Sequence, residues 1–159
     1  MEKGGENHGK LWKTHKGKRS NVFVGEYTHS IDDKGRLAIP AKMRRDLEDG
    51  AVVTRGIDTC LFVYPKNEWL KLAEKIAALP LSDPKARSFS RLMLAGAMEV
   101  EFDKLGRILL PSYLRDYATL KGEVTVAGVF NRVEIWEKKA WETYKSAHSV
   151  EEDLSTLNI

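Results

Sequence analysis

Two arginines hold equivalent places in a motif that occurs twice in this sequence, and residues placed in this way could bind an anion. Arg36 lies four residues after Asp32, and Arg107 lies four residues after Asp103. The planar guanidinium group donates hydrogen bonds as a fork, which fits a phosphate group or the edge of a guanine base. The motif therefore indicates two similar loops that could contact nucleic acid. The glycines that directly precede the two arginines are Gly35 and Gly106.

The same motif also has a purely structural interpretation. Asp-Lys-Gly is an ordinary turn sequence, in which the aspartate caps backbone N–H groups and the glycine adopts a positive φ. The arginine would then do no more than neutralise the aspartate. Since duplication of a turn also duplicates its architecture, the repetition alone does not decide between the two interpretations.

Further cations surround the first copy of the motif more densely than the second. Five of them lie within twelve residues, against the carboxylates of Asp32 and Asp33. In the second copy, Asp103 and Asp116 partly balance the basic residues. We therefore expect the first copy to carry more of any anion contact. The basic residues are Lys34, Arg36, Lys42, Arg44 and Arg45 in the first copy, and Lys104, Arg107 and Arg115 in the second.

The similarity between the two copies extends well beyond the motifs. Asp103 lies 71 positions after Asp32, and Gly96 follows Gly25 at the same spacing. After one inserted residue the spacing is 72, which aligns the pairs that follow. The chain therefore contains an internal duplication. The pairs are Val52 with Val124, Gly56 with Gly128, Tyr64 with Trp136, and Trp69 with Trp141.

Each copy predicts short strands followed by helices. In the first, alternating residues predict a strand over 22–31, a three-residue hairpin loop over 33–35 and a strand over 37–39. A short helix from Pro40 to Leu47 and strands over 51–55 and 60–64 follow. Two further helices are expected, one that closes over the sheet with an apolar stripe and one that begins after Ser82 or Asp83. Their predicted buried residues are Trp69, Leu72, Ala73, Ile76 and Leu79 in the first helix, and Phe89, Leu92 and Met93 in the second.

Neither half is large enough to be stable alone, so the two halves should share one core. Each has about 45 residues of short strands and small helices before its closing helix, and a unit of that size buries too little surface. We expect an α+β fold, a barrel of two repeats related by a pseudo-twofold axis, with flanking helices. The expected segments are a disordered basic arm (1–21), a first repeat with two closing helices (22–95), a second repeat (96–147) and a loosely attached tail (148–159) in which Leu154 and Leu157 could dock.

Charge and composition restrict the possible functions. Of 159 residues, 42% are hydrophobic, and no stretch approaches the length of a membrane span. Residues 1–20 hold six Lys/Arg and two Glu, so the remainder carries 20 basic and 21 acidic residues. Nucleic-acid binding would thus need a local basic patch. The single cysteine, Cys60, fits a reducing cytoplasm and is most simply a small core residue.

The residues described so far resemble those of the MraZ family of bacterial transcriptional regulators. The resemblance rests on the two Asp-x-x-x-Arg motifs with apolar residues and a proline after each, and on the segment 25–27 before the first. It covers residues 22–145, and the long stretch before Val22 departs from the family pattern. It implies a tandem swapped-hairpin β-barrel related to AbrB, a ring-shaped homo-oligomer, and binding to short direct repeats in the promoter of the division and cell-wall gene cluster. In that family the motif arginines are the candidates for DNA contact.

The resemblance therefore assigns roles to particular residues. It implies double-stranded DNA and further copies of the chain as partners, no cofactor, no metal and no membrane partner, in a nucleoid-associated cytoplasmic protein. The residues expected to contact DNA are Arg36 and Arg107, from the resemblance, and Lys34, Lys104, Lys42, Arg44 and Arg45, from the local charge. Those expected to orient the loops, from the turn chemistry of the motif, are Asp32, Gly35, Asp103 and Gly106.

Two other classes of function compete with DNA binding. An enzyme is disfavoured because the sequence has no phosphate-binding glycine-rich loop and no metal-ligand spacing among its histidines. A ring-forming scaffold, in which the Asp-Arg pairs are structural and join neighbouring subunits, is harder to exclude. Loss of the ring on replacing Arg36 would favour the scaffold, whereas loss of DNA binding with an intact ring would favour the regulator. The histidines are His8, His15, His29 and His148.

Overall fold

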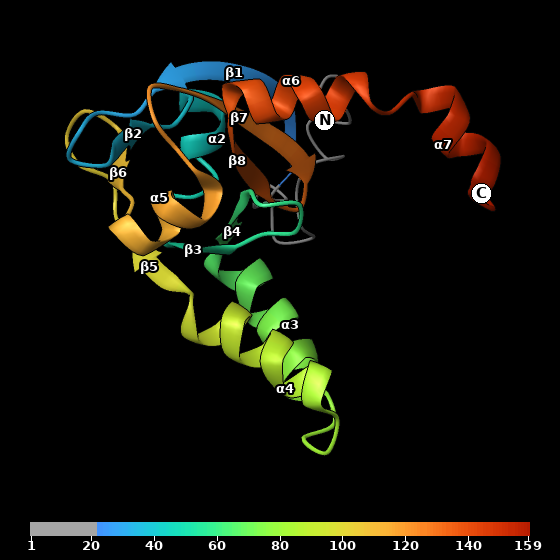
Figure 1. Ribbon diagram of the computed structural model, residues 1–159. Coiled ribbons are helices and arrows are strands. Elements are labelled where there is room, and N and C mark those ends of the chain that lie inside the picture. The colour runs from blue at the N-terminus through green and yellow to red at the C-terminus, as the bar shows by residue number, and fades with distance from the viewer. Residues whose placement is uncertain (1–21) are drawn as a thin grey trace, which may run out of the picture.

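The computed structural model describes residues 22–159 and has a mixed α+β fold built on antiparallel strands (Figure 1). The predicted arm over 1–21 lies outside the described residues. The first repeat contains β1 (Phe23–Ser30), β2 (Arg36–Ala38), α2 (Ala41–Arg44), β3 (Ala51–Arg55), β4 (Leu61–Pro65), α3 (Lys66–Ala77), α4 (Pro84–Ser90) and a π-helical segment η1 (Arg91–Ala95). It is followed by β5 (Met98–Val100), β6 (Arg107–Leu109), α5 (Ser112–Ala118), β7 (Glu123–Phe130), β8 (Val133–Glu137), α6 (Lys138–Ser146) and α7 (Val150–Thr156).

The strands of the two repeats pair mainly with each other. One sheet has the order β1-β7-β8-β4-β3-β5, and a second consists of β2 and β6 alone. Strands β5 to β8 are the duplicates of β1 to β4. The pair β1·β7 is therefore equivalent to the pair β5·β3, and each of the pairs β2·β6 and β4·β8 joins a strand to its own duplicate. Among the described residues, the hairpins β3·β4 and β7·β8 stay within one repeat, as does the single bridge between Ile31 and Leu37. Neither repeat can therefore form its sheet without the other.

The main core lies between the two repeats and draws on both. Leu37 and Ile39 of the first repeat and Ile108 and Leu110 of the second are each at most 1% exposed. They belong to one apolar cluster with the inward side chains of β3, β4, β7 and β8. The shared core that the small size of each half predicts is thus present.

A second, aromatic cluster lies on the other side of the sheet, beneath α3 and α6. The ring of Trp136 lies 5.2 Å from that of Trp141 and 5.1 Å from that of Tyr144, centroid to centroid. Cys60 is buried within this cluster, and burial raises the pKa of its thiol well above the usual range. The prediction that Cys60 is a core residue is therefore confirmed.

The hairpin formed by α3 and α4 projects from the body of the molecule, and here the sequence prediction is partly wrong. Ile76 in the last turn of α3 and Met93 of η1 are buried, but Leu79, Phe89 and Leu92 are exposed. The outer turns extend past the edge of the sheet into solvent (Figure 1). Only the base of the hairpin has sheet to cover, since Trp141 and Tyr144 of α6 occupy part of the same aromatic face.

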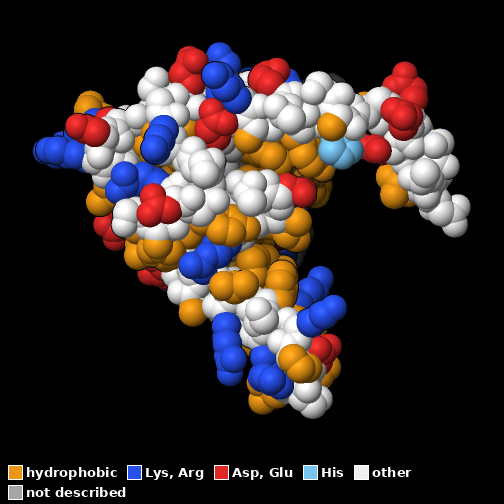
Figure 2. All heavy atoms as spheres, in the orientation of Figure 1, with side chains coloured by type: hydrophobic (Ala, Val, Ile, Leu, Met, Phe, Trp, Pro, Cys, Tyr) orange, Lys and Arg blue, Asp and Glu red, His pale blue; other side chains and the backbone are white. Residues whose placement is uncertain are grey.

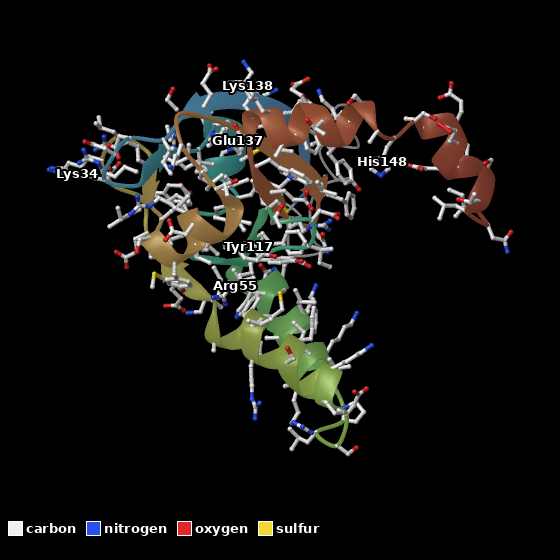
Figure 3. The ribbon with its side chains drawn as sticks, in the orientation of Figure 1. Lys34, Arg55, Tyr117, Glu137, Lys138 and His148 are labelled. Atoms are coloured by element: carbon white, nitrogen blue, oxygen red, sulfur yellow. The ribbon has the colours of Figure 1, made fainter. Side chains whose placement is uncertain are left out.

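The base of this hairpin is firmly attached. The Thr54 hydroxyl donates a hydrogen bond to the Met93 carbonyl oxygen at 2.7 Å, and Arg55 Nη1 donates to the Leu92 carbonyl oxygen at 2.9 Å. The Arg55 guanidinium also lies 5.8 Å from the centre of the Tyr117 ring, and Figure 3 shows the two side chains close together there. As predicted, Asp83 caps α4, accepting a hydrogen bond from the Lys85 N–H.

The last segment forms helix α7, which extends away from the rest of the chain (Figure 1). The sequence predicts Leu154 and Leu157 as docking points, yet both are exposed, so they dock on no described part of this chain. Within residues 22–159, none of the helices has the length and apolar character needed to cross a membrane.

Candidate nucleic-acid interface

The first motif folds into a closed three-residue loop whose arginine is held by its aspartate. Asp32 N–H donates to the Arg36 carbonyl oxygen at 3.1 Å, and Gly35 N–H donates to the Asp32 carbonyl oxygen at 3.0 Å. The Asp32 carboxylate accepts hydrogen bonds from the backbone N–H groups of Lys34 (3.1 Å) and Arg36 (2.8 Å). Its other oxygen accepts one from Arg36 Nε at 2.7 Å. Gly35 has φ +91°, which a glycine adopts without strain.

The second motif has the same geometry. The Asp103 carboxylate accepts hydrogen bonds from the backbone N–H groups of Leu105 and Arg107, both at 2.9 Å. Arg107 Nε donates to the other carboxylate oxygen at 2.8 Å. Gly106 has φ +76°. Both loops thus place an aspartate and an arginine opposite each other across the loop mouth.

These contacts keep both aspartates ionised. The backbone N–H of Arg36, together with its guanidinium, lowers the pKa of Asp32 to about 2. Arg107 lowers the pKa of Asp103 through the same pair of contacts. A guanidinium carries five N–H donors, of which each aspartate engages the one on Nε. Among the described residues, neither arginine side chain makes another hydrogen bond, so the Nη groups are available to a ligand.

The register of β2 and β6 places the two arginines on the same surface. Leu37 pairs with Ile108 at the centre of this ladder, and both are buried. Arg36 pairs with Leu109 and Ala38 with Arg107. Because side chains alternate across a strand, Arg36 and Arg107 lie on the outer face, as diagonal neighbours. The repeat thus brings both guanidinium groups together at one end of the molecule, where Lys34 points outward from its loop (Figure 3).

Each loop is also braced by the other repeat. Leu110 N–H donates to the Gly35 carbonyl oxygen at 2.8 Å, and Ile39 N–H donates to the Gly106 carbonyl oxygen at 3.2 Å. These bonds extend the β2·β6 ladder into both loops. They fix the distance between the two motifs, because neither loop can shift without breaking a bond to the other.

A second pair of arginines supports the loops from beneath. Arg115 Nε donates to the Leu110 carbonyl oxygen at 2.9 Å, and its guanidinium covers Gly35. Arg44 Nη1 donates to the Ile39 carbonyl oxygen at 2.8 Å, and its guanidinium covers Gly106. Arg44 therefore has a structural contact that sequence reasoning missed, and so does Arg115. The sequence does show that the two arginines are equivalent, since Arg115 lies 71 positions after Arg44. Which loop each arginine supports, however, depends on how the strands of one repeat pair with those of the other.

The remaining predicted cations are spread over both loops. Lys34 and Lys104 are exposed at the two loop tips, Lys42 is exposed on α2, and Arg45 is exposed directly after it. Because Arg44 of α2 packs against Gly106, the cations of the first repeat lie beside the second loop. The extra cations of the first copy therefore lie on a surface that both copies form together.

The two loop surfaces differ at the positions that the backbone does not constrain. Lys34 of the first loop corresponds to Leu105 of the second, which is 71% exposed. Ala38 corresponds to Leu109, which is 58% exposed. The first loop thus presents a cation where the second presents an apolar side chain.

A metal-binding cluster is lacking in the part of the chain that the structure describes, and the two histidines found there take part in other contacts or lie on a strand. No three of its His, Cys, Asp or Glu side chains come together in a way that could hold a metal ion. The His148 ring stacks on Tyr144, with 4.2 Å between ring centroids, and its Nδ1 lies 2.7 Å from the Tyr144 carbonyl oxygen. His29 lies half-buried on β1, and His8 and His15 fall outside the described residues.

Comparison with known proteins adds independent evidence. A family model described as "MraZ protein, putative antitoxin-like" matches the chain twice, over residues 22–92 and 93–157. A protein of Natranaerobius thermophilus named "Transcriptional regulator MraZ" is 56% identical over 143 residues, covering 87% of this chain and all of its own length. Proteins of the same name from Halothermothrix orenii and Carboxydothermus hydrogenoformans are 49% and 52% identical, covering 84% and 77% of this chain and 99% and 86% of their own lengths.

These findings confirm the resemblance on which the sequence interpretation rests. The two matches divide the chain into two repeats, as the internal duplication does. The relatives are named as transcriptional regulators, so the prediction that the protein is not an enzyme is confirmed as well. Since the family model spans nearly all of the described residues and the relatives share about half of their sequence with it, this chain belongs to the MraZ family.

Proposed function

We propose that this protein is a sequence-specific DNA-binding transcriptional regulator that meets DNA with the outer face of β2 and β6. The observation that carries this proposal is the pair of guanidinium groups on one surface, each oriented by a carboxylate through Nε. With Nε engaged, the Nη donors of Arg36 and Arg107 face outward as forks that match phosphate oxygens or the N7 and O6 atoms of guanine. Lys34, Lys104, Lys42 and Arg45 would add contacts to phosphates.

The fold proposed for this surface is a tandem AbrB-like swapped-hairpin barrel. The exchange of partners supports it, since β1 pairs with β7 and β5 with β3. In such an arrangement, the pseudo-twofold axis passes between β2 and β6 and relates the two arginine loops. The proposed segments are the arm (1–21), the repeats (22–95 and 96–147) and the tail (148–159).

We further propose that the protein acts as a ring of identical subunits on short direct repeats, in the promoter of the division and cell-wall gene cluster. Residues 21–159 carry 20 basic and 21 acidic side chains, so one subunit with a few outward cations would bind weakly. Linked subunits make each later contact intramolecular, which multiplies affinity by roughly 10² to 10⁴. Subunits related by rotation meet successive sites in one orientation, as direct repeats require. Such a protein would act in the cytoplasm, at the nucleoid.

The double variant Arg36→Ala with Arg107→Ala tests the proposal. Each lost guanidinium should cost about 1–3 kcal/mol per DNA contact, so binding to promoter DNA with two or three repeats should fall by more than about 100-fold in a gel shift. Lys139→Ala, which removes an exposed cation from α6, is the matched control and should bind like the parent. Parental affinity in the folded double variant would refute the proposal.

The same double variant also separates the regulator from the ring-forming scaffold. Size-exclusion chromatography with light scattering, performed without DNA, should give the parental mass if the Asp-Arg pairs serve DNA contact. Disassembly of the ring would instead support pairs that join subunits. A salt titration adds an independent check, because phosphate contacts require the binding constant to fall as the salt concentration rises.

A further inference from the structure

Helix α7 presents an apolar stripe that nothing in the described chain covers. Val150, Leu154 and Leu157 follow one another at spacings of four and three, and they are 80%, 50% and 59% exposed. Val150 and Leu154 therefore lie on one side of α7, and Leu157 is the extended residue that directly follows the helix. The helix has seven residues, and isolated helices shorter than about 12 residues are marginal in water. A surface that covers this stripe would stabilise α7.

The other side of α7 is acidic. Glu151, Glu152 and Asp153 occupy its first turn, and residues 147–159 contain no Lys or Arg. The Ser149 hydroxyl caps the helix by accepting a hydrogen bond from the Glu152 N–H at 3.0 Å. Carboxylates at a helix N-terminus are favoured by the helix dipole, so they fix where the helix begins. The segment is therefore a short helix with an apolar stripe and a strongly negative start.

The projecting α3–α4 hairpin has the complementary properties. Residues 66–95 contain six Lys/Arg and three Asp/Glu. Among the described residues, Lys75, Lys85 and Arg91 form no ion pair. Figure 2 shows Lys and Arg side chains along this hairpin, next to apolar ones. The exposed apolar side chains are Leu70, Leu79, Leu81, Phe89 and Leu92.

Resting on the ring proposed above, we propose that α7 of one copy packs along the α3–α4 hairpin of the neighbouring copy. The apolar stripe of α7 would cover Phe89 and Leu92, and its carboxylates would meet the unpaired cations of the hairpin. The partner is a second copy because the two elements leave the body of the molecule in different directions (Figure 1). The hairpin is a suitable receiver, since Thr54 and Arg55 hold its base in place.

This contact also has the symmetry that a ring needs. Each chain would offer one helix and one hairpin, and the two surfaces differ, so the contact is head-to-tail. Head-to-tail contacts generate a closed ring when the rotation between copies closes, with all copies facing the same way. The β2·β6 surface lies on neither element and stays free for DNA.

Two charge-reversed variants test the contact. The helix variant makes α7 basic, and the hairpin variant makes the hairpin acidic, so each alone would bring like charges together. We expect each to elute without DNA near the 18.0 kDa of a single chain, instead of as the parental ring. The changes are Glu151→Lys, Glu152→Lys and Asp153→Lys in the helix variant, and Lys75→Glu, Lys85→Glu and Arg91→Glu in the hairpin variant.

Mixing the two variants is the decisive measurement. The basic α7 of one matches the acidic hairpin of the other, and the acidic α7 of the second matches the basic hairpin of the first. An equimolar mixture should therefore reassemble into oligomers much larger than a single chain, and into the parental ring if the number of subunits is even. A contact within one chain would not produce this reassembly. All six positions are exposed, so circular dichroism of each variant should match the parent. The matched control, Lys121→Glu with Lys139→Glu, should remain a ring.

Several outcomes would overturn this contact. It is wrong if both variants keep the parental mass, or if each dissociates but the mixture does not reassemble. Failure of the proposed function is distinguishable, because it shows in other measurements. A parent that elutes as a single chain refutes the ring itself, and parental DNA binding by the Arg36 and Arg107 double variant refutes the DNA surface.

Discussion

The two arginine loops share one backbone design but present different surfaces. In both, an aspartate accepts two backbone N–H bonds and the arginine Nε, and a glycine with positive φ closes the loop. At the exposed position before the glycine, the first loop has Lys34 and the second has Leu105. After duplication, the residues that the loop geometry demands are the same in both copies, whereas those that point to solvent have diverged.

The glycines provide the sharpest test of whether the two loops are equally constrained. A Cβ on residue 35 would lie 2.6 Å from the Leu110 carbonyl oxygen, which is backbone, whereas the three atoms nearest to a Cβ on residue 106 all belong to the Arg44 side chain. We expect Gly35→Ala to lower the free energy of unfolding by about 3 kcal/mol or more, and Gly106→Ala by less, since a side chain can move away. Urea unfolding measures both.

Gly122→Ala separates two contributions to the lost free energy of unfolding, namely the strain of a positive φ in alanine and the clash of the new Cβ with its neighbours. Gly122 also has a positive φ, +62°, but no atom lies within 4 Å of where its Cβ would be. Its replacement should therefore cost about 1 kcal/mol, the backbone term alone. Equal losses at all three glycines would mean that contact between the repeats does not constrain the loops.

Arginine substitutions compare the two loops in DNA binding. Arg36→Ala should weaken binding by about 2 kcal/mol, roughly thirtyfold, and Arg107→Ala by about 1 kcal/mol, roughly fivefold. The first loop should lose more because, in the proposed complex, Lys34 contacts a phosphate beside Arg36, whereas Leu105 at the equivalent position cannot. Fluorescence anisotropy with promoter DNA measures both constants. Arg36→Lys, which keeps the charge but lacks the fork, should fall between the parent and Arg36→Ala. A larger loss for Arg107→Ala would reverse the ranking of the loops.

Leu105→Lys gives the second loop a lysine at the position that Lys34 holds in the first. One added phosphate contact should raise DNA affinity by about threefold at low salt and steepen the salt dependence by about one unit of slope. Lys34→Leu is the reciprocal variant and should change both quantities in the opposite direction. If Leu105→Lys instead weakens binding, Leu105 itself contacts a partner and the loops have different tasks.

Much of this architecture could be predicted from the sequence, because the two copies can be aligned and each supports the interpretation of the other. The strands, both hairpin loops and the facing of Asp32 with Arg36 follow from local turn chemistry and alternation. The need for a shared core follows from the small size of each half. Such features depend on short-range rules, which both copies obey independently.

Long-range packing could not be predicted in the same way. Nothing local indicates that Arg44 supports the loop of the other repeat, since this depends on which strands pair. The apolar residues Phe89 and Leu92 correctly predict an amphipathic helix, but an apolar stripe does not specify what covers it. The same holds for Leu154 and Leu157. On the α3–α4 hairpin and on the last segment alike, the spacing of apolar residues predicts burial, whereas within a single chain these side chains are exposed.

The dependence of stability on acidic pH should give the smallest difference between the two loops. The folded pKa of Asp32 is about 2, below the usual value near 3.9, so its ion pair stabilises the fold above pH 4. That contribution is lost as the pH falls from 4 towards 2. Asp103 is shifted in the same direction. Because both pairs are partly exposed, the effects should be small.

Thermal unfolding of Asp32→Asn and Asp103→Asn between pH 7 and pH 2.5 measures these contributions. Each variant should melt slightly below the parent at pH 7, and the gap should narrow below pH 4, where the parental aspartate begins to accept a proton. The gap should be wider for Asp32→Asn, since Arg36 lowers the pKa of its aspartate strongly. A gap that does not change with pH would assign the loss to the changed hydrogen bonds instead of the charge. In that case the two aspartates would act as caps for their loops, and the orientation of the guanidinium groups would depend on the brace between the repeats.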